Sequence, residues 1–341
     1  MNCRAGGILG IALLAGGLAC TAGGNDAPTP RPEPTAQLVA TTRVERPAPT
    51  ATTAPTATPT PAPTPAPTPV ALHSSPGCEL AIPVGDTIDS LLTTSGPRSY
   101  RLHVPLHYNP SQATPLVFNF HGSNRSAYDQ ESYTGLWQKA DAETFILIGP
   151  EGTGGEWDIE GYYADDGVDD VAFVLAILAH VSDQLCVDAT RVYATGFSNG
   201  AEMASLVGCR EPEVFAAIAP VSGVEYDYNC GVTELAVLSF QGTDDYNVYF
   251  DYAPPAMEEW ARHNHCAGTI SEERLSASVV RQAYDGCDAA EVILYVIEGG
   301  GHTWPGAPDD AGGSGGIGFT THEIDANDVI WKFFADHQRT P

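Results

Sequence analysis

The chain has 341 residues, of which 15 are Lys or Arg and 43 are Asp or Glu, so its formal net charge at pH 7 is −28. Nearly all of this negative charge falls after residue 75. A surface this acidic lacks the basic patches that bind nucleic acid or anionic lipid, so we expect neither partner, and it argues against a polyanionic substrate.

The first residues have the layout of a signal peptide. Arg4 is the basic residue of this segment, and an apolar run follows at 8–18. The run is too short to span a membrane. A cysteine directly after a small residue, in Ala19-Cys20, suggests a bacterial lipoprotein in which Cys20 is acylated after cleavage. We therefore expect a signal peptide at 1–19 and contact with a membrane only through lipid on Cys20. Plain secretion is the alternative.

Residues 20–75 are rich in Thr, Pro and Ala, as in ATTAPTATPTPAPTPAPTPV. Such a segment has almost no apolar side chains to bury, which predicts a disordered or polyproline II spacer. At about 3.1 Å per residue, the spacer could hold a folded domain on the order of 100 Å from an anchor. Residues 76–341 then form one domain of a size that is normal for an α/β enzyme.

Short apolar runs alternate with amphipathic segments along this domain. The runs predict buried strands at 115–120, 145–148, 191–195, 215–219, 235–240 and 292–297. The alternating segment 98–104 predicts an antiparallel edge strand, and apolar residues at helical spacing predict a helix over 171–185. Two further helices are expected at about 255–263 and 325–337. This order predicts a mostly parallel sheet that helices cover on both faces.

The domain has an even number of cysteines once Cys3 has left with the signal peptide and Cys20 carries lipid. An even number in an exported domain predicts three disulfides. We expect Cys266 to pair with Cys287, because these two are close in the sequence and lie apart from the others. The pairing stays open for Cys78, Cys186, Cys209 and Cys230.

The sequence His263-Asn264-His265-Cys266 could contribute to a zinc site, since His and Cys side chains are the ligands that zinc prefers. A structural zinc ion needs four such ligands, and no second cluster in the sequence completes the set. We therefore expect the protein to bind no metal and to use no cofactor.

The segment 191–204, RVYATGFSNGAEMA, joins a predicted strand to a predicted helix through Gly196-Phe197-Ser198-Asn199-Gly200. In a nucleophile elbow, the sequence Gly-x-Ser-x-Gly holds the serine on a strained strand-to-helix turn. Glycines flank the serine because side chains there would collide with neighbouring backbone. The helix start also directs N–H groups toward a developing oxyanion. Ser198 is therefore the candidate nucleophile, and an ordinary strand–turn–helix junction is the alternative.

A serine nucleophile needs a base, and the base needs a carboxylate that orients it. His302 lies in the sequence EGGGHTWPG, just after the predicted strand 292–297. A glycine-walled loop at the carboxyl end of a strand is where a catalytic histidine would reach the elbow. His322 is the second candidate, although a surface position or a helix start suits it better.

With an elbow of this kind the chain order is serine, acid, histidine, which directs attention to QGTDD at the end of strand 235–240. Asp244 and Asp245 are both at the correct end of the sheet, and the residues alone leave the choice open. The two oxyanion donors are expected to be the backbone N–H groups of Asn199 and of Ser123, which follows a predicted strand in FHGS. His121 is expected to brace that loop.

Together these motifs resemble the secreted feruloyl esterase and polyhydroxybutyrate depolymerase family of α/β-hydrolases. The resemblance covers essentially all of 76–341, and its motifs are RSYRLHVP, PLVFNFHGS, GPEGTGGEW, DDVAFV, CVDATRVYATGFSNGAEM, FAAIAPVSG, QGTDD and GGGHTWPG. It implies an α/β-hydrolase fold.

The resemblance also decides between the two aspartates. The family's acid lies two residues past Gly-Thr, which implies Asp245. Gln241 stands where the family usually has His, and Ala201 where a further glycine is common. These departures put substrate preference in doubt, but not hydrolysis.

The resemblance implies a secreted serine esterase with the catalytic residues Ser198, Asp245 and His302. The expected substrate is a feruloyl ester of plant cell-wall polysaccharide. A polyhydroxybutyrate depolymerase is the second candidate and an acetyl xylan esterase the third. A surface-binding protein with an inactive hydrolase fold is the alternative from another class. Three aromatic residues that flank the site are expected to contact substrate, namely Trp304, Trp157 and Tyr246.

Overall fold

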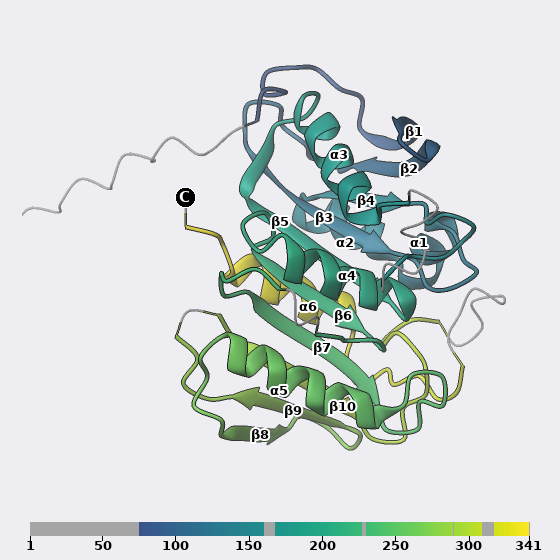
Figure 1. Ribbon diagram of the computed structural model, residues 1–341. Helices are drawn as coiled ribbons and strands as arrows, with labels where there is room; N and C mark the ends of the chain where they lie inside the picture. The colour runs from purple at the N-terminus through teal and green to yellow at the C-terminus, as the bar shows by residue number, and fades with distance from the viewer. Residues whose placement is uncertain (1–74, 160–167, 227–229, 289, 309–316, 341) are drawn as a thin grey trace, which may run out of the picture. The chain divides into compact units, whose positions relative to one another are not determined.

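The structure is a computed structural model that describes residues 75–159, 168–226, 230–288, 290–308 and 317–340 (Figure 1). The expected signal peptide, most of the expected linker and Cys20 lie outside these residues. All of the described residues belong to one unit, Pro65–Pro341. Among the described helices, none is both long enough and apolar enough to cross a membrane.

A ten-stranded sheet runs through the centre in the order β1-β2-β4-β3-β5-β6-β7-β10-β9-β8. Its six inner strands are mutually parallel: β4 (Ile146–Pro150), β3 (Thr114–Phe120), β5 (Val187–Phe197), β6 (Ala217–Val221), β7 (Ala236–Gly242) and β10 (Val292–Ile297). Antiparallel strands flank them, with β1 (Gly85–Thr93) and β2 (Gly96–Val104) on one side and β9 (Val279–Tyr284) and β8 (Ile270–Arg274) on the other. The predicted fold class is confirmed.

The six predicted buried strands are the six parallel strands, although β6 begins two residues later than expected. The prediction that segment 98–104 is antiparallel is confirmed, but the prediction that it forms the edge is wrong. β1 pairs along the outer side of β2, from Gly85 opposite Val104 to Thr93 opposite Gly96. Because most of its side chains are exposed or only half-buried, β1 has no apolar run that would reveal it in the sequence.

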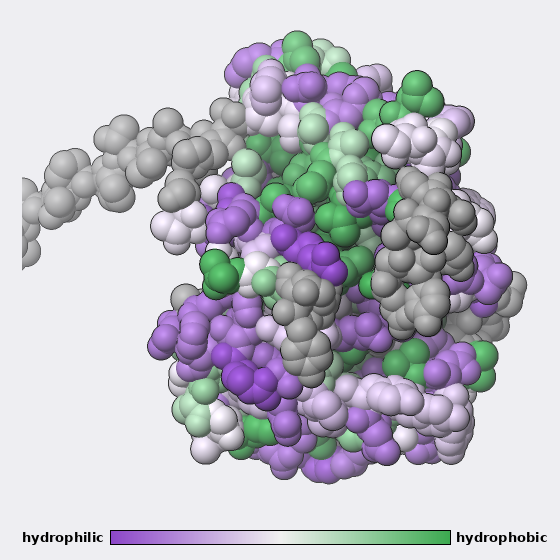
Figure 2. Space-filling view, viewed as in Figure 1, coloured by the Kyte–Doolittle hydropathy of each residue, from purple (hydrophilic) through white to green (hydrophobic). Residues whose placement is uncertain are grey.

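Helices cover both faces of the sheet, as predicted (Figure 1). One hydrophobic cluster holds the inner sides of α3 (Asp170–Ser182), α4 (Asn199–Arg210) and α5 (Ala253–His263). A second cluster, across the sheet, holds those of α1 (Ala127–Thr134), α2 (Leu136–Glu143) and α6 (Ala326–Asp336). On the first face, hydrophobic residues gather around α3 and α4, whereas hydrophilic ones cover most of the area over α5 (Figure 2).

Three disulfides join the cysteines of the described residues. The expected pair Cys266–Cys287 is confirmed, and it ties the end of α5 to the turn after β9. The pairs that the sequence left open are Cys78–Cys186 and Cys209–Cys230. Disulfides of this kind form and persist in oxidising compartments, which agrees with an exported protein.

A buried ion pair fixes the start of α3 against the sheet. Asp169 caps the helix through the N–H of Ala172, whereas Asp170 points inward and lies 2.6 Å from the Arg98 guanidinium of β2. The two residues are only 3 % and 8 % exposed. Burial raises the pKa of the Asp170 carboxyl, even though the charge of Arg98 acts in the opposite direction. Arg98 also lies over the ring of Phe173, 3.9 Å from its centroid.

Replacing Asp170 with alanine is expected to lower the free energy of unfolding by about 3–5 kcal/mol, because the charge of Arg98 would stay buried without its partner. Urea unfolding of the purified protein measures this. The neighbouring Asp169→Asn variant keeps a capping side chain and should stay within about 0.5 kcal/mol of the native protein. Equal losses in the two variants would contradict a special role for the ion pair.

Candidate active site

Ser198 lies on the sharp turn between β5 and α4. Its backbone has φ 57° and ψ −125°, a strained conformation that residues other than glycine rarely adopt. Its N–H donates to the carbonyl of Val221 at the end of β6, over 3.0 Å, and its carbonyl accepts from Ala201 and Glu202 in the first turn of α4. The residue is half-buried. These bonds hold a strained serine at the carboxyl end of the sheet, as expected of a nucleophile elbow.

The glycines around Ser198 allow three backbone segments to meet. A Cβ atom on Gly196 would lie 2.2 Å from the carbonyl oxygen of Gly200, and one on Gly200 would lie 2.2 Å from that of Phe120. A Cβ atom on Gly122 would lie 3.3 Å from the Cβ of Ser198, which places the loop after β3 against the elbow. The expectation that side chains would collide at the elbow glycines is therefore confirmed.

His302 and Asp245 come together beside this turn. His302 Nδ1 lies 2.8 Å from Asp245 Oδ2, and both residues are buried. The imidazole also packs against Phe197, the residue before Ser198, with ring centroids 4.6 Å apart. Asp244 is exposed instead, and its N–H donates to the carbonyl of Gly300. The structure thus brings together the loops after β5, β7 and β10, with Asp245 as the acid that faces the histidine.

Four groups hold the Asp245 carboxylate. Oδ1 accepts the N–H groups of Asn247 and Val248, both over 2.9 Å. Oδ2 faces His302 and also accepts from Gln241 Nε2, over 3.0 Å. Gln241 is buried, and its Nε2 donates to the carbonyl of Val248 as well, over 2.8 Å. The carboxylate therefore has little freedom to turn away from the imidazole.

The sequence reasoning missed the contact that Gln241 makes with Asp245. The difference of Gln241 from the family's usual histidine was expected to affect substrate preference, yet its side chain contacts the acid itself. The sequence did hold a signal of this contact, because Gln241 lies at the carboxyl end of β7, four residues before Asp245.

The backbone of His302 is fixed by the segment that begins at Ile317. His302 and Ile317 exchange both backbone hydrogen bonds, each over 2.7 Å, and the N–H of Gly301 donates to Phe319 over 2.9 Å. A Cβ atom on Gly301 would lie 2.3 Å from the carbonyl oxygen of Ile317. Because residue 301 is a glycine, the segment that begins at Ile317 can lie directly against the histidine loop.

His121 braces the loop that carries Ser123, as predicted. It is fully buried, its Nε2 accepts the N–H of Gly152 over 2.9 Å, and its Nδ1 lies 2.9 Å from the carbonyl of Gly122. These partners require the proton on Nδ1, so the ring donates to Gly122 and is neutral. Burial lowers the pKa of His121, which favours the same neutral form.

The structure contradicts the expectation that Trp157 and Trp304 contact substrate, because they are only 2 % and 0 % exposed. The indole N–H of Trp157 donates to the carbonyl of His121, and that of Trp304 donates to Asn327 Oδ1. The side chain of Asn199 accepts the backbone N–H of Trp157, over 2.8 Å. The tryptophans therefore support the elbow and the loops beside it.

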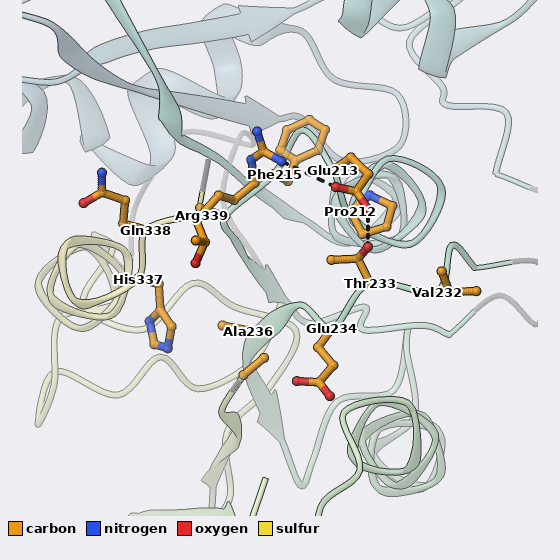
Figure 3. A pocket seen from close by; sticks show the side chains of 13 residues that line it. Pro212, Glu213, Phe215, Val232, Thr233, Glu234, Ala236, His337, Gln338 and Arg339 are labelled. Atoms are coloured by element: carbon orange, nitrogen blue, oxygen red, sulfur yellow. Dashed lines mark hydrogen bonds and ion pairs between the residues drawn. The ribbon is translucent and has the colours of Figure 1, made fainter. Parts of the chain in front are cut away.

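A cavity of about 220 Å³ lies next to His302. We call it the histidine cavity; its other lining residues are Asp244, Tyr246, Asn247, Gly299, Gly301, Ile317, Gly318 and Phe319. Tyr246 is 76 % exposed at this place, so the expectation that it contacts substrate remains open to test. A larger cavity of about 460 Å³ lies where β6 and β7 begin, and the ion pair of Glu213 and Arg339 forms part of its wall (Figure 3). That cavity is at the opposite end of the strands from His302.

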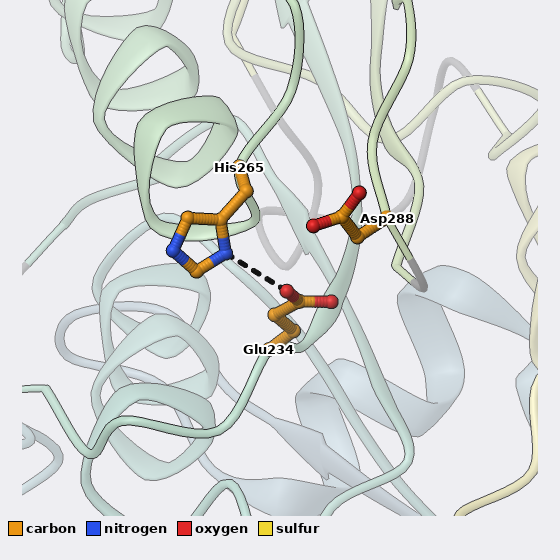
Figure 4. Close-up of side chains that lie close together, drawn as sticks. All are labelled: Glu234, His265 and Asp288. Atoms are coloured by element: carbon orange, nitrogen blue, oxygen red, sulfur yellow. Dashed lines mark hydrogen bonds and ion pairs between the residues drawn. The ribbon is translucent and has the colours of Figure 1, made fainter.

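Glu234, His265 and Asp288 form the one group of possible metal ligands that the described residues contain, with one atom from each within 4.8 Å of the others (Figure 4). His265 Nδ1 already pairs with Glu234 Oε1, over 2.9 Å. Cys266, which the sequence offered as a zinc ligand, is in a disulfide. Exposed acidic groups often lie together without an ion, so this geometry alone assigns no metal.

Comparison with known proteins agrees with this architecture. A family model described as esterase PHB depolymerase matches residues 98–251, which include Ser198 and Asp245. A probable feruloyl esterase C of Aspergillus clavatus is 31 % identical over 246 residues, covering 70 % of this chain and 83 % of that protein. Feruloyl esterase C of Emericella nidulans is 28 % identical over 270 residues, covering 76 % and 91 %.

Among solved structures, an acetyl xylan esterase from Aspergillus awamori is similar in fold, with a TM-score of 0.56 and 14 % identity over 73 % of this chain and 99 % of that one. A thermostable esterase gives a TM-score of 0.52 with 17 % identity, over 74 % and 63 % of the two chains. The sequence relatives and the fold together make this chain a carboxylic ester hydrolase. It belongs to the feruloyl esterase and polyhydroxybutyrate depolymerase family of α/β-hydrolases.

Proposed function

We propose that the protein hydrolyses feruloyl esters of plant cell-wall polysaccharide with Ser198, His302 and Asp245 as its catalytic residues. The catalytic part of this proposal rests on the 2.8 Å contact between His302 Nδ1 and Asp245 Oδ2, which lies beside the strained turn at Ser198. Serine, acid and histidine occur in the chain order of this fold. The chemistry needs no group beyond these side chains and the backbone.

In the proposed reaction, Ser198 Oγ attacks the ester carbonyl carbon and its proton passes to Nε2 of His302. Asp245 holds the ring through Nδ1 and stabilises the imidazolium that forms. The backbone N–H groups of Asn199 and Ser123 are proposed to bind the oxyanion, at about 3–4 kcal/mol each by analogy with measured donors. His302 then protonates the leaving alcohol oxygen, and water activated by the same ring releases the acyl group as an acid.

The Ser198→Ala variant is expected to lose turnover of p-nitrophenyl acetate by a factor on the order of 10⁴ or more, because it lacks the nucleophile. A fluorophosphonate probe should label the native protein at Ser198 and leave the variant unlabelled. Ser205→Ala, which removes another hydroxyl from α4, serves as the control and should be labelled. Appreciable hydrolysis by Ser198→Ala would disprove the assignment, and an unreactive native protein would favour a binding role.

Replacing Gln241 with leucine is expected to lower kcat for p-nitrophenyl acetate about ten-fold with little change in KM. The variant removes a hydrogen bond to a charged group, worth about 1.5–3 kcal/mol, from the carboxylate that orients His302. Steady-state kinetics measure the effect, and thermal unfolding checks that the variant is folded. Gln282→Leu, on β9, is the matched control. A native kcat in folded Gln241→Leu would show that Asp245 does not depend on this amide.

The substrate part of the proposal comes from the relatives. Those reported above are named feruloyl esterases, which supports a hydroxycinnamate ester as substrate. The family model's description favours a polyhydroxybutyrate depolymerase as the alternative, and the structural neighbour an acetyl xylan esterase.

We also propose export of the folded domain on its Thr- and Pro-rich spacer, with lipid on Cys20 as its tether. The three disulfides support the export.

Methyl ferulate, acetylated xylan and polyhydroxybutyrate, offered side by side to the purified protein, separate these candidates. We expect acid to be released from methyl ferulate about ten-fold or more faster than from the other two at equal concentrations of ester groups, since an enzyme discriminates substrates by differential transition-state binding. Chromatography of the released acids measures all three. Hydrolysis of polyhydroxybutyrate without release of ferulate would replace the feruloyl assignment with the depolymerase.

A further inference from the structure

We infer that Ser222 is a positioning residue, whose hydroxyl fixes the loop of His302 relative to the elbow of Ser198. Ser222 comes directly after β6 and is buried, with 1 % of its surface exposed. The inference rests on the proposed function, because it takes Ser198 and His302 as the reacting pair. It adds the residue that sets the separation of the two loops that carry this pair.

The backbone of Ser222 is strained. Its φ of 54° lies in the left-handed region, which is unfavourable for a residue that has a Cβ atom. Ser198, with φ 57°, is strained in the same way. Strain of this kind persists only where the surrounding structure enforces it, and it gathers at functional sites. The two strained serines are close neighbours, because the N–H of Ser198 donates to the carbonyl of Val221, the residue before Ser222.

The segment 221–223 lies directly against the elbow. Val221 pairs with Phe197 where β6 and β5 end. A Cβ atom on Gly223 would lie 2.6 Å from the carbonyl oxygen of Ser198 and 3.1 Å from the Cβ atom of Ala201. No side chain fits between the segment and the elbow, so the two must move together.

Ser222 also contacts the strand of the acid and the loop of the histidine. Its N–H donates to the carbonyl of Phe240, near the end of β7, over 2.9 Å. Its Oγ donates to the carbonyl of Thr303, over 3.3 Å. Thr303 follows His302 directly and is buried as well. Ser222 therefore joins the segment behind the elbow to β7 through its backbone, and to the loop after β10 through its hydroxyl.

The hydroxyl matters because the acid holds the imidazole at one atom. Asp245 contacts Nδ1 of His302, so the distance from Nε2 to Ser198 depends on the backbone that carries the ring. Ile317 holds this backbone at His302 itself, and the Ser222 hydroxyl holds it at the next residue. Proton transfer needs the two atoms within about 2.6–3.2 Å, so a small displacement of the loop lowers the rate and leaves substrate binding unchanged.

Two substitutions in the full-length protein separate the hydroxyl from the stability of the fold. Ser222→Ala and Ser222→Gly both remove Oγ. Glycine adopts a φ of 54° without strain, so Ser222→Gly is expected to unfold at a higher urea concentration than Ser222→Ala. Despite this difference in stability, both variants are expected to hydrolyse p-nitrophenyl acetate with kcat about five-fold lower and KM within about two-fold of the native value.

The rate of labelling by a fluorophosphonate gives a second readout that does not involve the ester. It is expected to fall about five-fold in both variants, because Ser198 needs His302 as its base in this reaction too. Ser239→Ala is the matched control. Ser239 is buried on β7 and its Oγ donates to the carbonyl of Pro220, over 3.0 Å, so this variant loses a similar bond that does not reach the loop of His302.

The kcat of Ser239→Ala is expected to stay within about two-fold of the native value. A native kcat in Ser222→Gly overturns the inference, because that variant lacks the hydroxyl. So does a loss of kcat that follows the urea midpoints of the two Ser222 variants, or an equal loss in Ser239→Ala. A native protein that neither hydrolyses the ester nor reacts with the probe defeats the proposed function, and the inference with it.

Discussion

The close backbone contact between the elbow and the loop after β3 is the constraint on which the rest of the site depends. Gly200 lies so near the carbonyl of Phe120 that no side chain fits between them. This contact holds the start of α4 directly against the FHGS loop. Two donors that come from segments fixed against each other, as we propose for Asn199 and Ser123, need little rearrangement when negative charge develops. Trp157 and Asn199 strengthen the same junction from its buried side.

A second arrangement fixes the proposed acid and base, which follow a different pair of strands, β7 and β10. Asp245 is held by its own turn and by Gln241, and His302 by two backbone bonds with Ile317. The serine, the acid and the histidine thus sit on separate loops, each with its own support. Parallel strands make this possible, since all their carboxyl ends meet at one edge of the sheet.

The sequence could predict the inner strands and the catalytic candidates because both leave local signals. Buried strands are apolar runs, and the elbow and the histidine loop need glycines at fixed places. β1 and β8 lacked such runs because their side chains are largely exposed. Trp157 and Trp304 were misjudged because nearness to a motif in the chain does not reveal whether a side chain points inward. The contact of Gln241 with Asp245 depended on the turn of residues 242–248, which sequence spacing did not show.

The exposed edge strand β8 has a consequence for how molecules of this protein behave when crowded. Its residues are all exposed, and Glu272, Glu273 and Arg274 place charges along the last strand of the sheet. An unpaired strand edge is a template onto which another chain can add, and charged side chains make such pairing costly because they would lose water. At high concentration, molecules of this protein can in this way keep their sheets apart and stay separate.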